Sequence, residues 1–299
     1  MGILSWLIVK GLPLVPRAIV GRVASRYVAG EKLEDALAVV ERLSAEGAMA
    51  TLDLLGEEVA ERSKATAAAD EYVRMLDAIA ARGLPANVSI KLTSLGLKID
   101  TEFCRENAER IVAAAAGHGN FVRIDMEDHT TTDRTLAIYR EIFTRHQNVG
   151  VVFQAYMRRT LADIAALPAA GANVRLCKGI YIEPRAVAWK GYETVRMNFL
   201  RALEKLLAAG VYVGIATHDE HLACGAVALV DRLQVPRERY EFQMLHGVDP
   251  ELRQILIAGG HRLRVYVPYG RDWYPYSTRR LRENPEVATH ILKGMFGAR

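Results

Sequence analysis

The chain has 299 residues and a formal net charge of +4 at pH 7, and 51% of its residues are hydrophobic and 25% charged. This composition is ordinary for a soluble globular protein with a large core, and a mild charge without a dense Lys/Arg block argues against a nucleic-acid partner. The three cysteines are scattered and form no Cys-x-x-Cys pair. Their pattern predicts a reducing compartment and excludes a disulfide framework or a structural zinc site.

The first twenty residues, MGILSWLIVKGLPLVPRAIV, are apolar but interrupted by Lys10, Pro13, Pro16 and Arg17. No uninterrupted run long enough to span a bilayer remains. The basic start and small-residue cleavage site of a secretory signal are also missing. With the helical segment that follows at 31–47, we expect residues 1–47 to form an N-terminal helical arm. This arm could pack on the fold, join subunits of a homo-oligomer, or dip into a membrane surface.

From residue 48 onward, short β-branched runs alternate with Ala/Leu/Glu/Arg-rich segments of helical periodicity. The strand-like runs are 49–57, 87–97, 121–129, 149–157, 173–181, 211–219, 240–248 and 262–270. Helical segments between them include 59–82, 102–116, 131–146, 184–209 and 249–258. This alternation predicts an α/β fold with one (β/α)8 barrel domain over residues 48–299. An open doubly wound sheet is the alternative, but no Gly-x-Gly-x-x-Gly follows the first strand.

In the predicted strands, apolar and polar residues occupy alternate positions, so each strand has one apolar and one polar set of residues, its two parities. In the second strand Val88 and Ile90 alternate with Ser89 and Lys91, whereas parallel strands covered on both faces are usually apolar throughout. If the apolar parity faces the helices, the polar parity must point into the barrel. The ionisable and amide residues of this inward set are Lys91, Arg123, Asp125, Gln154, Arg175 and Arg264.

Unpaired buried charges are costly, so these inward residues must either pair with one another or serve a ligand. Lys91 or Arg123 could pair with Asp125, and a purely structural pairing is an equal alternative for Arg123 and Arg264. At the carboxyl ends of barrel strands a functional role is favoured. Because the basic residues outnumber the acidic ones, we expect the cavity to bind an anion.

The segment YSTRRLRE at 276–283 follows the eighth strand after PYGRDWYP. One face of a helix over this segment would carry Tyr276, Arg279, Arg280 and Glu283. A solvated surface face is the simplest explanation for such a pattern. Arginine, however, binds a carboxylate through two parallel hydrogen bonds, and this pair would start near the mouth of a barrel that favours an anion. We therefore interpret the segment as a carboxylate clamp.

YSTRRLRE contains the complete pattern Tyr-x-x-Arg-Arg-x-x-Glu, and NVSIKLTSLGL, VRIDMED, VFQAYM, VRLCKGIY and GIATHD precede it in that order. In these six segments, residues 48–299 resemble the flavin-dependent proline dehydrogenases, and the chain looks like a one-domain bacterial member. The resemblance implies a distorted (β/α)8 barrel that holds FAD and oxidises L-proline to Δ1-pyrroline-5-carboxylate, the first step of proline degradation to glutamate. Hydride would pass to flavin N5 and electrons to a membrane quinone. A cytoplasmic protein that could contact the inner face of the plasma membrane is expected.

The resemblance also assigns side chains to the substrate. Two arginines and a lysine would hold the proline carboxylate, a glutamate would orient the arginines, and two tyrosines would pack on the ring. These residues are, in that order, Arg279, Arg280, Lys91, Glu283, Tyr266 and Tyr276.

Asp125 and Arg175 are the residues implied to take part in catalysis. Asp125 would lie beside Lys91, and Arg175 would lie against the flavin near N5 and stabilise negative charge on the reduced ring. The other cofactor contacts implied are Met126, Gln154, Lys178, Gly179, Ile180, Thr217 and His218.

Residues 177–180 include two that suit a bound cofactor and two that differ from the residue types expected in the family. Gly179 suits close approach of a ligand to the backbone, and Lys178 suits a phosphate. Ile180 stands where a small residue is expected, and Cys177 where an aliphatic one is expected. We expect Cys177 to serve packing rather than redox chemistry.

Other kinds of barrel protein remain as alternatives. A metal-dependent hydrolase would draw its ligands from His129, His218, Asp219, His221 and His246. No His-x-His pair ends the first strand, so we predict no metal. A phosphate-binding lyase or isomerase lacks the Gly-rich loops expected after strands seven and eight. A non-enzymatic scaffold is least favoured, because polar inner faces destabilise a barrel that binds no ligand.

Overall fold

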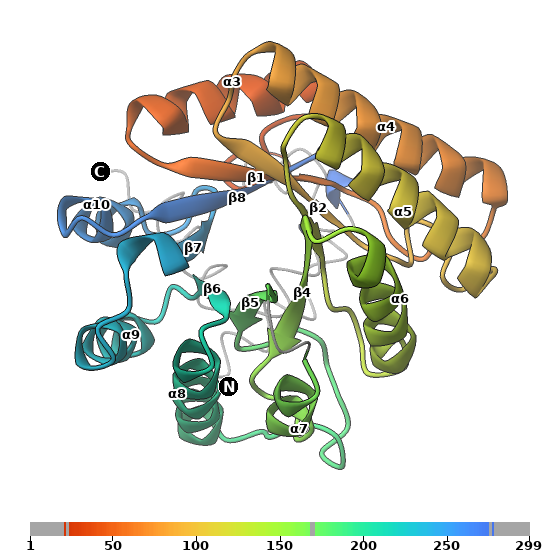
Figure 1. The fold of residues 1–299 in the computed structure, drawn as a ribbon. Helices are drawn as coiled ribbons and strands as arrows, with labels where there is room; N and C mark the ends of the chain where they lie inside the picture. Colours follow the sequence, from red (N-terminus) through yellow and green to blue (C-terminus); the bar gives the residue numbers. More distant parts are fainter. Residues whose placement is uncertain (1–20, 22–23, 168–170, 275–276, 278–299) are drawn as a thin grey trace.

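The computed structural model describes residues 21, 24–167, 171–274 and 277, and eight parallel strands in it form a closed barrel in sequence order (Figure 1). The strands are β1 (Met49–Leu54), β2 (Ala86–Ile90), β3 (Val122–Ile124), β4 (Val149–Gln154), β5 (Asn173–Cys177), β6 (Tyr212–Ala216), β7 (Tyr240–Leu245) and β8 (Leu263–Tyr269). The helices are α3 (Leu33–Ala45), α4 (Arg62–Ala81), α5 (Thr101–Gly117), α6 (Thr132–Arg145), α7 (Thr160–Ala165), α8 (Tyr192–Ala208), α9 (Glu220–Arg232) and α10 (Pro250–Ala258). A single 3-10 turn, η2 (Arg237–Arg239), precedes β7. The predicted (β/α)8 barrel is confirmed.

The strands are shorter than the sequence predicted. Every predicted strand-like run continues past the end of its strand into the loop that follows, where the chain still alternates between polar and apolar residues. The predicted helix 184–209 begins only at Tyr192, after Gly191 as the N-cap residue. Polar residues that the sequence placed within strands therefore lie in part on the loops at the carboxyl ends of the strands.

The two parities of the strands face in the directions that the sequence predicted. Val88 and Ile90 of β2 are fully buried and belong to the same apolar core as Tyr72 and Met75 of α4. The polar parity faces the interior of the barrel. Arg175 of β5, for example, donates to Ser89 of β2, a strand that is not its neighbour.

Two strand glycines provide room for large polar side chains inside the barrel. A methyl group on Gly150 of β4 would collide with the carbonyl oxygen of Asn173 and the guanidinium of Arg123. A methyl group on Gly214 of β6 would collide with the Gln243 amide. The small residues of β4 and β6 thus complement the bulky polar residues of β3 and β7.

The described part of the N-terminal arm packs on the barrel. Ala24 and Val28 are buried, Ala29 N donates to Pro268 O, and Gly270 N donates to Gly30 O. Helix α3 packs against β8 and β1. These contacts attach residues 24–45 to the strands that close the barrel.

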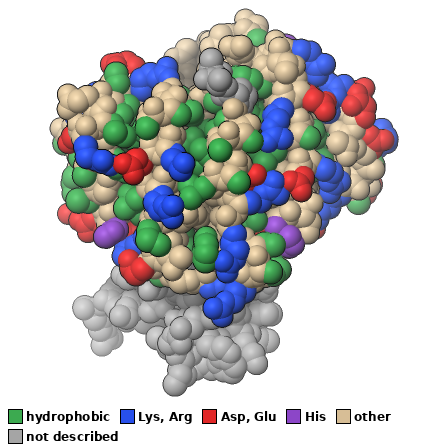
Figure 2. All heavy atoms as spheres, turned by 60° about the horizontal axis from the view of Figure 1, so that its bottom comes forward, with side chains coloured by type: hydrophobic (Ala, Val, Ile, Leu, Met, Phe, Trp, Pro, Cys, Tyr) green, Lys and Arg blue, Asp and Glu red, His purple; other side chains and the backbone are tan. Residues whose placement is uncertain are grey.

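The outer surface is chemically mixed. On the face that lies at the bottom of Figure 1, Lys and Arg side chains are interspersed with Asp, Glu and apolar ones (Figure 2). Within the described residues, no helix is both long and apolar enough to cross a membrane.

Candidate active site

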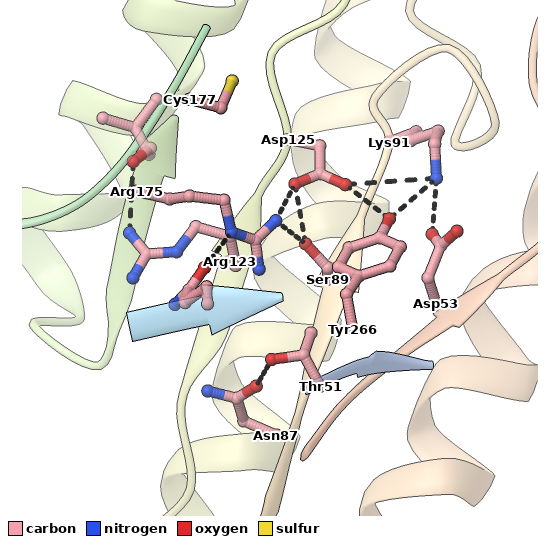
Figure 3. Close-up of polar contacts among 12 residues, drawn as sticks. Thr51, Asp53, Asn87, Ser89, Lys91, Arg123, Asp125, Arg175, Cys177 and Tyr266 are labelled. Atoms are coloured by element: carbon pink, nitrogen blue, oxygen red, sulfur yellow. Dashed lines mark hydrogen bonds and ion pairs between the residues drawn. The ribbon is translucent and has the colours of Figure 1, made fainter. Parts of the chain in front are cut away.

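Asp125, directly after β3, is at the centre of a hydrogen-bond network inside the barrel (Figure 3). Arg175 Nη1 donates to Asp125 Oδ1 at 2.6 Å and to Ser89 Oγ at 3.2 Å. Ser89 Oγ donates to the same carboxylate oxygen at 2.8 Å, and the Tyr266 hydroxyl donates to Asp125 Oδ2 at 2.8 Å. Both carboxylate oxygens are therefore bound, and Asp125 holds side chains from β2, β5 and β8 together.

Lys91, the first residue after β2, extends this network to β1. Its Nζ donates to Asp53 Oδ1 at 2.5 Å and to the Tyr266 hydroxyl at 3.3 Å, and lies 4.0 Å from Asp125 Oδ2. Burial alone lowers the pKa of the Lys91 ammonium, but the two carboxylates outweigh burial and raise that pKa above its ordinary value. Lys91 is therefore a cation at neutral pH, available to an anionic ligand.

The sequence reasoning missed Asp53, which is fully buried. A signal was present, because Thr51 and Asp53 alternate with Ala50 and Leu52 in β1 as the polar and apolar residues do in β2. The same parity argument applied to the first strand would have placed Asp53 inside the barrel.

A lower layer of the barrel interior contains the other predicted inward arginines. Arg264 pairs with Glu241, with 2.7 Å between Nε and Oε1. Arg123 does not pair with Asp125, although the sequence left that pairing open. Its Nη1 donates to the carbonyl oxygens of Val151 at 3.1 Å and Asn173 at 2.6 Å. Both arginines are thus engaged in holding the barrel together, which supports the structural alternative for them.

Arg175 links the two layers. Its Nε donates to Gln243 Oε1 at 2.5 Å, and Gln243 Nε2 donates to Glu241 Oε1 at 2.6 Å. Arg175 is 7% exposed. Its guanidinium is therefore fixed by partners on three strands, and the network defines the direction in which it presents its charge.

Apart from Arg175, which lies within β5, the residues predicted for the cofactor lie at or after the last residues of β3, β4, β5 and β6. Gln154 Nε2 donates to the Glu127 carbonyl at 2.9 Å, and Met126 is nearly buried. Thr217 Oγ1 accepts from Asp219 N at 3.0 Å, and His218 Nε2 accepts from Leu245 N at 2.8 Å. The His218 ring is therefore fixed to the backbone at the end of β7.

The segment after β5 combines a cation, a glycine and exposed apolar side chains. Lys178 Nζ lies 3.1 Å from Asp219 Oδ2. Gly179 has φ of +108°, and a methyl group there would collide with the Tyr156 ring, so only glycine suits this position. Ile180 is 46% exposed. Cys177 accords with a packing role, because burial raises the pKa of its thiol to about 12.

The structure brings together Lys91, Asp125, Arg175 and Tyr266, four of the residues that the sequence assigned to substrate and catalysis. Their other predicted partners, Tyr276, Arg279, Arg280 and Glu283, lie outside the described residues. The carboxylate clamp therefore stays a prediction.

Of the candidate metal ligands, His129, His218 and Asp219 have other partners. No group of three or more His, Cys, Asp or Glu side chains that could hold a metal occurs in the described part of the chain. His129 Nδ1 pairs with Glu183, and Asp219 binds Lys178 and Arg196. This geometry gives no support to the metal-dependent hydrolase.

Comparison with known proteins decides the family. Residues 36–291 match the family model described as proline dehydrogenase. The chain belongs to the proline dehydrogenase family. It is 40% identical over 277 residues to the proline dehydrogenase of Deinococcus radiodurans, which covers 91% of this chain and 89% of that one. It is 39% identical over 272 residues to proline dehydrogenase 1 of Bacillus subtilis, with coverage of 91% and 90%.

The fold has a counterpart among solved structures. The crystal structure of proline utilization A from Bdellovibrio bacteriovorus superposes with a TM-score of 0.83 at 23% identity, covering 88% of this chain and 32% of that one. This likeness confirms the barrel. Proline dehydrogenase activity and an oxidoreductase class follow from the family.

Proposed function

We propose that this proline dehydrogenase transfers a hydride from L-proline to N5 of FAD, forms Δ1-pyrroline-5-carboxylate, and passes the electrons to a quinone. The observation that supports this best is the network of Lys91, Asp125, Arg175 and Tyr266. It places two cations, Arg175 paired with Asp125 and Lys91 paired with Asp53, around one tyrosine at the carboxyl ends of the strands. Such a site suits a small amino acid with a carboxylate and an apolar body.

Lys91 is proposed to bind the substrate carboxylate, assisted by Arg279 and Arg280, with Glu283 orienting the arginines. Its ammonium is held by Asp53 and retains a proton for a further acceptor. Tyr266 is proposed to pack on the proline ring with Tyr276. Because its hydroxyl is fixed by Asp125 at 2.8 Å, the orientation of the ring is set before substrate binds.

Arg175 is proposed to stabilise negative charge that develops on the cofactor. Asp125, Ser89 and Gln243 fix its guanidinium in advance, so little reorganisation accompanies the reaction. We propose that Asp125 acts in catalysis by positioning Arg175 and Tyr266.

The residues after β5 and β6 fit a flavin dinucleotide. Exposed Ile180 and the side chain of Ile182, which is 92% exposed, are apolar surfaces that a ring system could cover. Lys178 provides a cation for phosphate, and Gly179 permits backbone approach. Bound FAD would supply the hydride acceptor. The residues proposed to hold it are Met126, Gln154, Arg175, Lys178, Gly179, Ile180, Thr217 and His218.

The test is a visible absorption spectrum of the purified protein, before and after anaerobic addition of L-proline. We expect a flavin spectrum that bleaches, and that recovers when a short-chain quinone is added. D-proline is the matched control. A flavin spectrum that L-proline leaves unchanged would contradict the substrate, and a colourless protein that FAD cannot reconstitute would contradict the cofactor.

A further inference from the structure

Asp219, the residue after His218 and the N-cap position of α9, collects an unusual number of donors. Its side chain is 2% exposed. It accepts from Lys178 Nζ at 3.1 Å, from the Tyr192 hydroxyl at 2.8 Å, and from Arg196 at 2.9 Å and 2.7 Å. Burial raises the pKa of this carboxyl, but the hydrogen bonds from Arg196, Tyr192 and Lys178 outweigh burial and lower that pKa well below its ordinary value. Asp219 is thus an anion whose capacity to accept is already used.

The donors that Asp219 holds are only partly used. The side chains of Lys178 and Arg196 are 33% and 20% exposed. An ammonium carries three N–H groups and a guanidinium five. Asp219 takes one from Lys178 and two from Arg196, and exposed Glu193 accepts one more from Arg196 at 3.0 Å. Both cations therefore keep N–H groups for a further acceptor.

The two cations are also held on one ring. Lys178 Nζ lies 5.0 Å and Arg196 Cζ 4.2 Å from the centroid of Tyr192, whose hydroxyl donates to Asp219. The Asp219 carboxylate and the Tyr192 ring thus orient two side chains, Lys178 from the loop after β5 and Arg196 from α8. Lys178 follows Arg175 by three residues, so their Cα atoms are at most about 10 Å apart, and this corner adjoins the region proposed for the flavin ring.

We propose that Asp219 is a positioning residue for a phosphate-binding corner made by Lys178 and Arg196, which takes the diphosphate of the dinucleotide cofactor. This inference rests on the proposed FAD. Asp219 acts by holding the two cations in one arrangement, so that their remaining N–H groups converge on phosphate oxygens without a loss of side-chain entropy at binding. It does not touch the cofactor itself.

Removing the Asp219 carboxylate should weaken FAD binding if Asp219 positions the two cations, and should tighten it if only the net charge of the corner matters. Asp219→Asn makes the corner more positive by one unit, and charge alone would then tighten binding of a phosphate. Loss of positioning would weaken it. The sign of the change in FAD affinity therefore separates the two explanations.

The experiment measures binding of FAD and of riboflavin to apoprotein by quenching of flavin fluorescence. Riboflavin carries the ring without phosphate. For Asp219→Asn we expect FAD to bind about 10-fold more weakly, the size expected for disturbed charge-assisted hydrogen bonds, with riboflavin affinity within 2-fold of wild type. Glu204→Gln, which removes the partner of Arg232 elsewhere on α8, should change neither.

A second variant tests whether Asp219 acts through Arg196. Arg196→Met should also weaken binding of FAD but not of riboflavin. In the double variant Asp219→Asn/Arg196→Met, the loss of FAD affinity should be smaller than the two single losses combined. Unchanged or tighter FAD binding by Asp219→Asn would overturn the positioning role, and so would an equal loss for FAD and riboflavin. Wild-type apoprotein that binds no FAD would overturn the proposed function, and this inference with it.

Discussion

At the scale of single residues, the interior of the barrel contains its charges in two layers with different surroundings. In the upper layer Lys91 and Arg175 face Asp53 and Asp125. In the lower layer Arg123 has carbonyl oxygens as partners, and burial together with the nearby Arg175 lowers its pKa to about 9. The upper layer is thus the one in which cations and carboxylates are combined within reach of a ligand.

Asp53→Asn is expected to impair proline turnover through Lys91. The variant removes the carboxylate that lies 2.5 Å from Nζ, so the ammonium would move toward Asp125 and lose its position for the substrate carboxylate. We expect kcat/KM for proline to fall about 10- to 100-fold, the effect of one or two disturbed charged hydrogen bonds. Bound flavin should be retained. Steady-state kinetics with a soluble dye as acceptor measures this.

Asp77→Asn is the matched control, because that carboxylate pairs with His118 and is 60% exposed. It should leave kcat/KM unchanged. Wild-type kinetics in Asp53→Asn would show that Lys91 does not depend on this pair.

Glu241 is expected to make stability depend on pH. Burial raises the pKa of its carboxyl, but Arg264 and hydrogen bonds from Gln243 and Tyr212 outweigh burial and lower that pKa from 4.5 to about 2. Because the folded-state pKa lies below the unfolded one, the stabilisation is fully present above about pH 4.5 and is lost as pH falls toward about 2. At neutral pH it amounts to about 3 kcal/mol.

Urea unfolding of Glu241→Gln should therefore show a free energy of unfolding about 3 kcal/mol below wild type at pH 7. The difference should shrink at pH 3, where the wild type has begun to lose the same stabilisation. Glu204→Gln, an exposed change, should be near wild type at both values. A difference that grows on acidification would contradict the assignment.

At the scale of elements, the loops at the carboxyl ends of the strands are fastened to one another. Glu127, after β3, accepts from the backbone N–H of Thr93 at 3.0 Å and also from its hydroxyl, and so connects the ends of β2 and β3. Gln154 of β4 donates to the Glu127 carbonyl at 2.9 Å. These hydrogen bonds therefore connect the ends of three consecutive strands, next to Lys91 and Asp125.

Packing between β4 and β5 gives a prediction at this scale. Gly150→Ala would place a methyl group against the Asn173 carbonyl oxygen and the Arg123 guanidinium. The Asn173 backbone cannot move without separating paired strands, and Arg123 would lose its bonds to backbone carbonyls. We expect a loss of about 1–3 kcal/mol in the free energy of unfolding, as for overpacked cores. Chemical denaturation measures this loss.

Gly117→Ala at the end of α5 is the control, because no atom lies within 4 Å of the added methyl group. That variant should be neutral or more stable, by up to about 1 kcal/mol. Equal stability of Gly150→Ala and wild type would show that the barrel accommodates a wider β4.

At the scale of the whole molecule, residues 24–30 pack beside the last strand of the closed barrel. Residues 24–30 run against β8 and the loops around it, and a methyl group on Gly247 would collide with the Arg26 carbonyl. Residues 26–30 are therefore joined to β8 and to the loops that follow β7 and β8.

Two deletions test these contacts. Removing residues 1–30 exposes the surface under Ala24 and Val28 and leaves Pro268 O and Gly270 N without their partners Ala29 and Gly30. We expect a lower Tm than in a protein that lacks only residues 1–20, which keeps these contacts. Differential scanning calorimetry compares the two. Equal Tm values would mean that residues 21–30 do not stabilise the barrel.

The same pair of proteins tests the proposed membrane contact of the arm. If residues 1–20 bind a lipid surface, the shorter deletion should abolish binding to vesicles and leave turnover with a soluble dye intact.

The sequence by itself determined the order of the elements and the side of each strand that is polar. Alternation of β-branched and helical segments predicted the barrel, and period-two patterning placed Lys91, Asp125 and Arg175 inside it. These properties are local, because the chain direction and the pleat decide which face a side chain occupies. The strand bounds were predicted too long, because the alternation continues into the loops.

Only the tertiary structure decided which inward residues meet. Asp125, after β3, binds Arg175 of β5, a strand that is not its neighbour. Lys91 binds Asp53, and Arg123 binds backbone carbonyls instead of a carboxylate. The apolar and polar pattern of one strand does not say which side chains of other strands its inward residues will contact. Those contacts depend on barrel closure, on the register of the strands and on where a glycine leaves room. The face of a residue is a property of its own segment, whereas its partner is a property of the closed barrel.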